Sequence, residues 1–304
     1  MAKSKNLKSK SEFMRQTTGG KIADIMILFI LTVAGFFTLY PFIYVFSMSI
    51  SDPAEVMKMT IKFFPKGFSL KSYELILENP NIWRYYYNTI WYTVVGVLAN
   101  IVVTVTFAYP LSRKEFCLKK PLMVFMSIPM FFSGGMIPSF LVISKLGLYN
   151  TRWALILPGA MSIWVAVMAR VYFQTTIPDA VVEAAKIDGC NDLRILGRIV
   201  VPLSKPILAV IGLYNAVSFW NLYLNAVIYI SDAKLQPLQV YLQRIIIGNS
   251  PDISANVTGT LQRTMYGNQM KYSIIVFSIL PIICVYPLLQ KYFVKGVMVG
   301  SLKG

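Results

Sequence analysis

The chain has 304 residues, a formal net charge of +16 at pH 7 and a hydrophobic fraction of 56%. Charged residues make up only 14% of the chain, whereas a soluble domain of this length carries roughly a quarter. This composition excludes an ordinary soluble protein, because most of the surface must face something other than water. It also argues against a nucleic-acid partner, since the basic residues lie between apolar runs, as in loops that meet anionic lipid.

Cysteine and histidine usage limits the chemistry of the chain. There is no histidine, so the commonest transition-metal ligand and general base is absent. The three cysteines, Cys117, Cys190 and Cys284, lack the spacing of a zinc site or a disulfide framework. We therefore expect no catalytic residues, no metal and no cofactor in this chain. A membrane enzyme or assembly factor, the alternative, would need a clustered acid–base or metal set.

Apolar segments recur along the chain and predict its fold class. Each is long enough to cross roughly 30 Å of hydrocarbon, where only a helix pairs all of its backbone groups within one segment. The prediction is an all-α membrane protein with six transmembrane helices, at about 22–50, 85–111, 121–143, 153–173, 207–230 and 272–293. Prolines such as Pro41, Pro129 and Pro281 predict kinks or broken ends.

Lys and Arg concentrate on one side of these spans, which predicts the orientation. That side holds residues 1–21, the gaps after the second and fourth spans, and the tail 294–304. We expect a multi-pass protein of the cell membrane with both termini in the cytoplasm. The predicted domains are a basic cytoplasmic segment (1–21), a membrane domain (22–293) and a cytoplasmic tail (294–304). The long external loops are 51–84 and 231–271, and the long cytoplasmic loop is 175–205.

The sequence of the cytoplasmic loop predicts two short helices joined by a tight turn. Pro178 at a first helical position and Asp179 in the first turn indicate a helix start. Gly189 permits the left-handed turn that ends this helix. A second short helix is expected at 191–198.

The spacing in this loop resembles the EAA loop of ABC-importer permeases. The matching residues are Glu183, Ala184, Ala185, Asp188, Gly189, Ile199 and Pro202. Val201 departs from the pattern, where the family usually has leucine. Three further motifs, Tyr87-Asn88-Thr89, Trp220-Asn221 and the tail 293–297, resemble carbohydrate-uptake permeases of the maltose-transporter type. The second external loop and the tail 296–304 resemble the subgroup that imports polysaccharide-derived oligosaccharides.

The resemblance implies a type I ABC-importer permease fold with a coupling helix between spans four and five. Glu183, Ala184, Ala185, Asp188 and Gly189 would dock on an ATPase subunit. The implied partners are a different but related second permease, two ATPase subunits that carry ATP and Mg²⁺, an extracytoplasmic sugar-binding protein and an oligosaccharide. An amphipathic helix lying on the membrane surface is the alternative interpretation.

The chain has no phosphate-binding loop of its own. Such a loop reads Gly-x-x-x-x-Gly-Lys-Ser/Thr. The nearest match, Gly19-Gly20-Lys21, has Arg15 where the first glycine belongs and Ile22 where the hydroxyl belongs. We therefore expect a non-catalytic subunit.

Polar residues in the fifth predicted span indicate a substrate path. On a continuous helix they cover an arc of about 80°; they are Tyr214, Ser218, Asn221, Asn225 and Tyr229. Amides, hydroxyls and aromatic rings suit a neutral sugar, and Asn100 in the second span is a further candidate. The alternative is hydrogen bonding between helices. Intramembrane acids are absent beyond the terminal Asp24, which argues against a proton- or sodium-coupled carrier.

The second external loop faces the side from which a solute arrives. By resemblance, Gln239, Tyr241 and Gln243 would contact the binding protein. A solvated loop that closes over the helices is the alternative. A channel or carrier without ATPases, and an ABC importer of amino acids or metals, also remain open.

Overall fold

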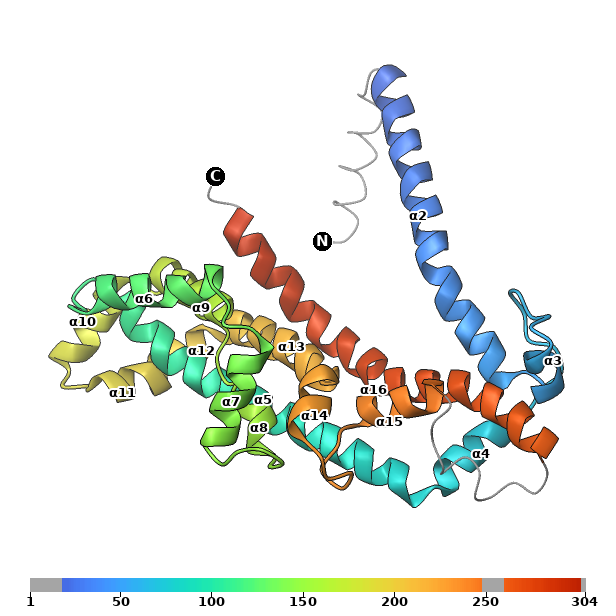
Figure 1. The fold of residues 1–304 in the computed structure, drawn as a ribbon. Coiled ribbons are helices and arrows are strands. Elements are labelled where there is room, and N and C mark those ends of the chain that lie inside the picture. The colour runs from blue at the N-terminus through green and yellow to red at the C-terminus, as the bar shows by residue number, and fades with distance from the viewer. Residues whose placement is uncertain (1–17, 248–259, 302–304) are drawn as a thin grey trace. The chain divides into compact units, whose positions relative to one another are not determined.

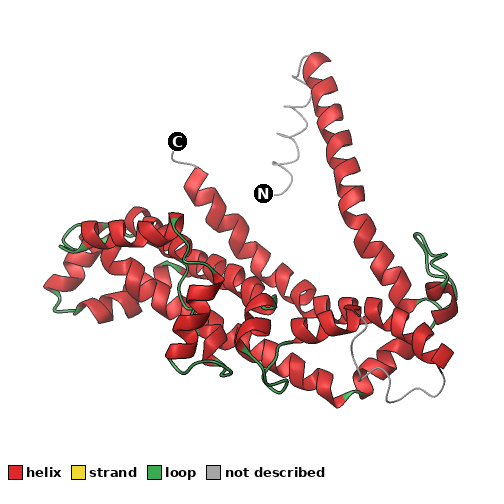
Figure 2. Ribbon diagram, in the orientation of Figure 1, coloured by secondary structure: helices red, strands yellow, loops and turns green. Residues whose placement is uncertain are grey.

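The structure is a computed structural model that describes residues 18–247 and 260–301. The described residues are all in helices, turns and loops, with no strand among them (Figures 1 and 2). They fall into two units, which we describe separately. The basic segment predicted at 1–21 and part of the loop 231–271 lie largely or partly outside the described residues.

The first unit contains the long helix α2 (Thr18–Ile50), the short helix α3 (Pro53–Met57) and the first part of α16 (Thr260–Ser301). The Gln269 amide of α16 donates to the backbone carbonyls of Ser49, Ser51 and Ser69 at 2.8–3.2 Å. The hydroxyls of Ser72, at the start of α4 (Lys71–Glu78), and Ser273 are 2.7 Å apart. These buried hydrogen bonds connect the end of α2 to α16.

The second unit is organised around α5 (Pro80–Ser112), which packs against α9 (Ile163–Thr176) and α13 (Lys205–Trp220). Asn79 caps the start of α5 by accepting from the Asn81 backbone N–H, and Pro80 occupies its first turn. The other helices of this unit are α6 (Lys119–Phe131), α7 (Met136–Lys145), α8 (Trp153–Ile156), α10 (Asp179–Ile187), α11 (Asp192–Ile195), η1 (Leu196–Val200), α12 (Val201–Leu203), α14 (Leu224–Tyr229) and α15 (Leu238–Ile247).

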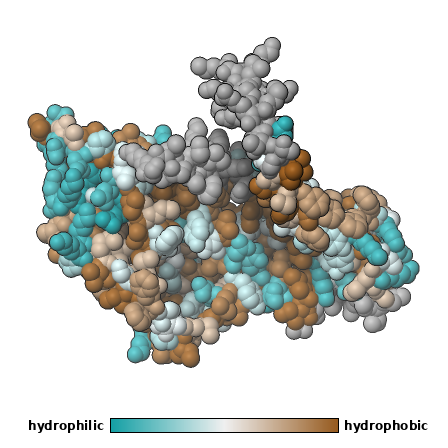
Figure 3. All heavy atoms as spheres, turned by 90° about the horizontal axis from the view of Figure 1, so that it is seen from above, coloured by the Kyte–Doolittle hydropathy of each residue, from teal (hydrophilic) through white to brown (hydrophobic). Residues whose placement is uncertain are grey.

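Among the described residues, three helices are long and apolar enough to cross a membrane: Gly20–Ile50, Pro80–Ser112 and Met265–Val285. Two bent pairs also qualify if each counts as one span: α6 with α7, bent by 119°, and Asp192–Leu203 with α13, bent by 82°. The structure therefore supports three to five spans. Large exposed hydrophobic residues cover these helices, and apolar side chains occupy much of the face in Figure 3.

The predicted spans at 121–143, 153–173 and 207–230 are not continuous helices. The first breaks at residues 132–135, where Gly135 adopts a φ of 84°. The second is regular only from Ile163, after the short helix α8, and the third is interrupted after Trp220. Breaks are tolerated at membrane depth where the chain is enclosed by protein, and α8 fits this rule because Ala154, Leu155 and Ile156 are fully or almost fully buried.

The two regions predicted as long external loops carry helices. Residues 51–84 contain α3, α4 and the start of α5, and residues 231–271 contain α15 and the start of α16. Charged residues in these two regions excluded them from the predicted membrane spans, but such residues do not prevent a helix from forming.

Candidate functional site

The predicted coupling loop (residues 175–205) forms two short helices joined by a tight turn. Helix α10 begins at Asp179, one residue later than predicted, because Pro178 has extended backbone angles and occupies the N-cap. The helix ends in two hydrogen bonds, from the Gly189 N–H to the Lys186 carbonyl and from the Cys190 N–H to the Ala185 carbonyl. This pattern is a Schellman motif, and Gly189 has the φ of 77° that it requires.

The second short helix of the coupling loop is longer than predicted. Asn191 caps α11 by accepting from the Arg194 N–H at 2.9 Å. The helix then continues through the π-helical segment η1 and α12 to Ser204, beyond the predicted end at residue 198. The bend into α13 follows directly, so the coupling loop is joined to α13 without a flexible linker.

The inner face of the coupling loop is buried. Val182 and Ala185 of α10 share a hydrophobic core with Val105 and Ala108 of α5 and Phe173 of α9. Ile195, Leu196 and Val200 from the second helix join the same core. Ala185 is therefore an inward-facing core residue, at 7% exposure.

The outer face of the coupling loop is exposed. It presents Glu183, Ala184, Asp188 and Gly189. The apolar side chains of Ile187 and Leu193 are 86% and 77% exposed beside them. Large apolar side chains held in the open next to polar ones are typical of a protein-docking surface.

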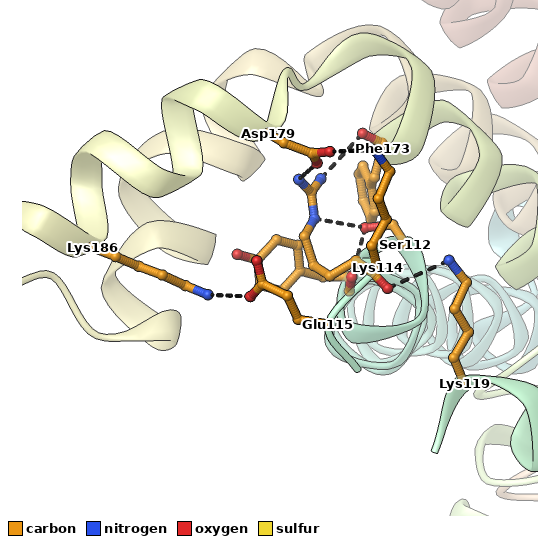
Figure 4. A network of polar contacts seen from close by, with 9 residues as sticks. Ser112, Lys114, Glu115, Lys119, Phe173, Asp179 and Lys186 are labelled. Carbon is orange, nitrogen blue, oxygen red and sulfur yellow. Dashed lines mark hydrogen bonds and ion pairs between the residues drawn. The ribbon is translucent and has the colours of Figure 1, made fainter. Parts of the chain in front are cut away.

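Ion pairs connect both ends of α10 to residues 113–118, which we call the α5–α6 turn (Figure 4). Near the start of α10, Asp179 lies 3.0 Å from Lys114 Nζ and 3.4 Å from Arg113 Nη1. Near its end, Lys186 Nζ lies 2.8 Å from Glu115. The hydrogen bond from Lys114, followed by the charge of Lys114, lowers the pKa of Asp179, and the hydrogen bond to Glu115 raises the pKa of Lys186.

The structure does not place the five polar residues of the fifth predicted span on one continuous helical face. Tyr214 and Ser218 are exposed on α13. Asn221 is the C-cap of α13 and donates to the Val217 carbonyl, so the helix ends there. Asn225 is exposed on the separate helix α14, whereas Tyr229 is buried, with its ring stacked 6.4 Å from that of Phe140.

Asn100, the other candidate for the path, is fully buried between helices. Its amide donates to the Gly159 carbonyl at 3.0 Å, and its Oδ1 accepts from Asn215 at 2.9 Å and from Thr104 at 3.3 Å. With these partners it connects α5, α13 and the segment before α9. Hydrogen bonding between helices explains Asn100 without a substrate.

The loop after α14 is fixed to the third and fourth turns of α5. The Asn88 amide donates to the carbonyls of Lys234 and Gln236, and the Tyr92 hydroxyl donates to that of Leu235. Thr89 Oγ1 accepts from the Leu238 N–H at 2.8 Å. Seven side-chain and backbone groups therefore define the path of the chain into α15.

The three residues predicted to contact a binding protein differ in exposure. Gln239 and Gln243 are half-buried, with part of each side chain accessible. Tyr241 is 1% exposed, stacks on Tyr85 at 4.7 Å and accepts a hydrogen bond from Asn79. Its role within this chain is to pack α15 against α5.

Comparison with known proteins decides the family. Residues 101–299, which include the coupling loop, match the family described as "Binding-protein-dependent transport system inner membrane component". The chain belongs to this family. It is the membrane permease component of a binding-protein-dependent ABC transporter, and therefore a non-catalytic subunit that works with ATPase and binding-protein partners.

Two relatives in Bacillus subtilis and one solved structure are similar over almost the whole chain. Protein LplC is 38% identical over 96% of this chain and 98% of its own length. The polygalacturonan/rhamnogalacturonan transport system permease protein YtcP is 37% identical over 93% of this chain and 99% of its own. The crystal structure of a bacterial ABC transporter involved in the import of the acidic polysaccharide alginate matches with a TM-score of 0.83 and 35% identity, covering 91% of this chain and 99% of that one.

The sequence did not identify Arg113, Lys114 and Glu115 as part of the site. Arg113 and Lys114 lie in the gap after the second predicted span, where their charge indicated only the orientation of the chain. The order of charges in the α5–α6 turn is visible in the sequence, but its position beside α10 depends on the packing of α5 against α9.

Proposed function

We propose that this chain forms half of the translocation path of an ATP-driven importer for polysaccharide-derived oligosaccharides. The observation that carries the proposal is the two-faced coupling loop. Its inner face is part of the core of α5 and α9, while Glu183, Ile187 and Leu193 are exposed to a partner. The names of the relatives, which refer to polygalacturonan, rhamnogalacturonan and alginate, support the substrate class.

The proposed membrane arrangement has six spans with both termini in the cytoplasm. The helices Gly20–Ile50, Pro80–Ser112 and Met265–Val285 supply three of them, and the bent pair of α6 and α7 supplies a fourth. The fifth is α13 followed by α14, because residues 192–203 belong to the coupling loop. The sixth is the broken segment of α8 and α9, both of which pack against α5. This arrangement places the coupling loop and the α5–α6 turn in the cytoplasm, and the loop before α15 outside.

The proposed mechanism is alternating access in a complex of two related permeases and two ATPase subunits. The binding protein delivers the oligosaccharide from outside, with Gln239 and Gln243 among the accessible residues on that side. ATP and Mg²⁺ bind to the ATPase subunits, whose closure moves the coupling loops. Tyr214, Ser218, Asn221 and Asn225 are the exposed polar residues that we assign to the path.

A pull-down with the full chain tests the assembly. The wild-type chain is expected to co-purify a second permease and two copies of an ATPase from detergent. Glu183→Lys reverses a charge on the exposed face of the coupling loop and is expected to lose the ATPase while it keeps the second permease. Glu78→Lys, the same change at an exposed residue of α4, is the control. A wild-type chain that purifies alone and transports without ATP contradicts the proposal.

The ATPase activity of the complex with its binding protein tests the substrate class. We expect stimulation by an oligosaccharide, and comparing an oligogalacturonate with raffinose distinguishes acidic from neutral sugars. The uncharged polar residues assigned to the path favour the neutral sugar, whereas the relatives' names favour the acidic one. Stimulation by an amino acid or a metal ion, with no response to either sugar, contradicts the assignment to oligosaccharides.

A further inference from the structure

The α5–α6 turn presents its charges in the order that matches α10. The turn reads Arg113, Lys114, Glu115, two cations followed by an anion. Helix α10 carries Asp179 in its first turn and Lys186 in its last, about 10 Å apart along the helix axis. The observed ion pairs satisfy both ends at once. The reversed orientation would place like charges together, so the pattern specifies one direction for α10.

The turn is itself held on the ends of two core helices. The side chain of Arg113 is only 12% exposed. Its guanidinium donates to the Phe173 carbonyl of α9 at 3.2 Å and to the Ser112 hydroxyl of α5 at 3.1 Å, and lies 5.3 Å from the centre of the Tyr109 ring. A displacement of the turn relative to α5 and α9 would break these contacts. The turn therefore moves with the two helices.

Hollow space lies beside the ion pairs. A cavity of about 390 Å³ separates part of α10 and α11 from the end of α5, and its lining includes Tyr109, Glu115, Lys186 and Leu193. A second cavity, of about 150 Å³, is lined by Arg113, Lys114, Asp179 and Glu183, among others. On this side α10 meets the turn across charges and empty space, while Val182 and Ala185 on its neighbouring face pack in the apolar core.

We propose that Arg113, Lys114 and Glu115 are positioning residues that fix the tilt of the coupling helix α10 and transmit its displacement to α5 and α9. This inference rests on the proposed function, because it assumes that an ATPase subunit binds the outer face of α10 and displaces the helix. Exposed ion pairs contribute little to overall stability. Their loss is therefore expected to affect the transfer of movement more than folding.

Reversal of one ion pair tests the proposal in the reconstituted complex of permeases, ATPases and binding protein. The variants are Glu115→Lys, Lys186→Glu and the double exchange. The readout is the amount of oligosaccharide transported per ATP hydrolysed. Each single variant is expected to lower this ratio at least about threefold while the ATPase still co-purifies, and the double exchange is expected to restore most of it. Recovery in the double variant separates a direct contact from two independent effects.

A matched control is available in α4. Lys71 Nζ and Glu74 lie 2.7 Å apart with side-chain exposures of 50% and 57%, compared with 43% and 70% for Lys186 and Glu115. Glu74→Lys should leave the ratio unchanged. The proposal is overturned if the single variants keep the wild-type ratio, or if the double exchange is no better than either single variant. Failure of the proposed function is a different result, in which the wild-type complex contains no ATPase.

Discussion

The amide of Asn215 on α13 donates a 2.9 Å hydrogen bond to Asn100 Oδ1 on α5, and both side chains are buried. The same amide group also donates a hydrogen bond to the Ile211 carbonyl at 2.8 Å. Because Asn100 also donates to the Gly159 carbonyl, two polar side chains join three segments of the membrane domain.

Asn100→Ala should destabilise the membrane domain without abolishing assembly. Each lost hydrogen bond between membrane helices costs about 0.6 kcal/mol on average and up to about 1.7 kcal/mol. We expect a lower thermal unfolding temperature in detergent. Asn221→Ala is the control, since this exposed amide bonds only within its own helix among the described contacts. It should leave the unfolding temperature unchanged, and equal losses in the two variants would contradict the distinction between a structural Asn100 and a path residue Asn221.

Gly96→Ala should destabilise the packing of α5 against α13. A Cβ at this position would lie 2.6 Å from the ring of Phe219, which is too close for the ring to stay in place. Overpacking of this kind costs about 1–3 kcal/mol. Thermal unfolding of the detergent-solubilised chain measures the loss, and Gly35→Ala, with open space around its Cβ, is the control. Combining Gly96→Ala with Phe219→Leu should recover part of the stability; no recovery would mean that the ring is not the obstacle.

Gly189→Ala should weaken ATPase binding through backbone strain. Space for the methyl group is available, but a φ of 77° costs a residue with a Cβ about 1 kcal/mol. Relaxation of that strain would open the turn between α10 and α11 and displace the exposed face. The fraction of ATPase that co-purifies should fall, and Gly189→Asn should retain more of it because asparagine tolerates the left-handed region. Equal binding by the alanine variant would show that the turn need not be rigid.

Asp179 and Lys186, which pair with the α5–α6 turn, should keep their charges under physiological conditions. The pKa of Asp179 lies below its ordinary value of 3.8, so its contribution is present above that pH and is lost as the pH falls through the lower value of the folded state. The pKa of Lys186 lies above 10.5, so its contribution is lost only as the pH rises through that higher value. Transport per ATP in the wild-type complex should be constant between about pH 6 and pH 9. A step in this range that disappears in Asp179→Asn would contradict the expectation.

The coupling loop could be predicted from local signals, whereas the interruptions of the membrane helices could not. Asp179, Gly189 and Asn191 act within one or two turns of their own position, as first-turn acid, left-handed glycine and N-cap. No proline or glycine marks the helix end at Asn221, and the short helix α8 packs against the distant segments α5 and α14. Hydropathy measures composition along the chain, so it joins two half-helices into one predicted span.

The positions of the polar candidate residues could likewise not be predicted from local signals alone. Helical periodicity grouped Tyr229 with Tyr214, but it could not reveal that the helix ends between them or that Tyr229 stacks on Phe140. Asn100 was recognised as a polar membrane residue, yet its partner Asn215 is remote in sequence. Periodicity gives a direction only while the helix is continuous.

Two side chains, one in the first half of helix α5 and one directly after its end, hold other segments of the chain. The distance between these two anchors fixes the length of the helix. Asn88 holds the backbone of residues 234 and 236, and Arg113 directly after the helix holds Asp179 and the Phe173 carbonyl. Inserting one residue between these anchors would rotate one end relative to the other by about 100° and lengthen the helix by about 1.5 Å. Both anchors could not then be satisfied. Variation within α5 is therefore confined to substitutions, and a working chimera of two such permeases must take α5, residues 231–238 and the coupling loop from the same parent.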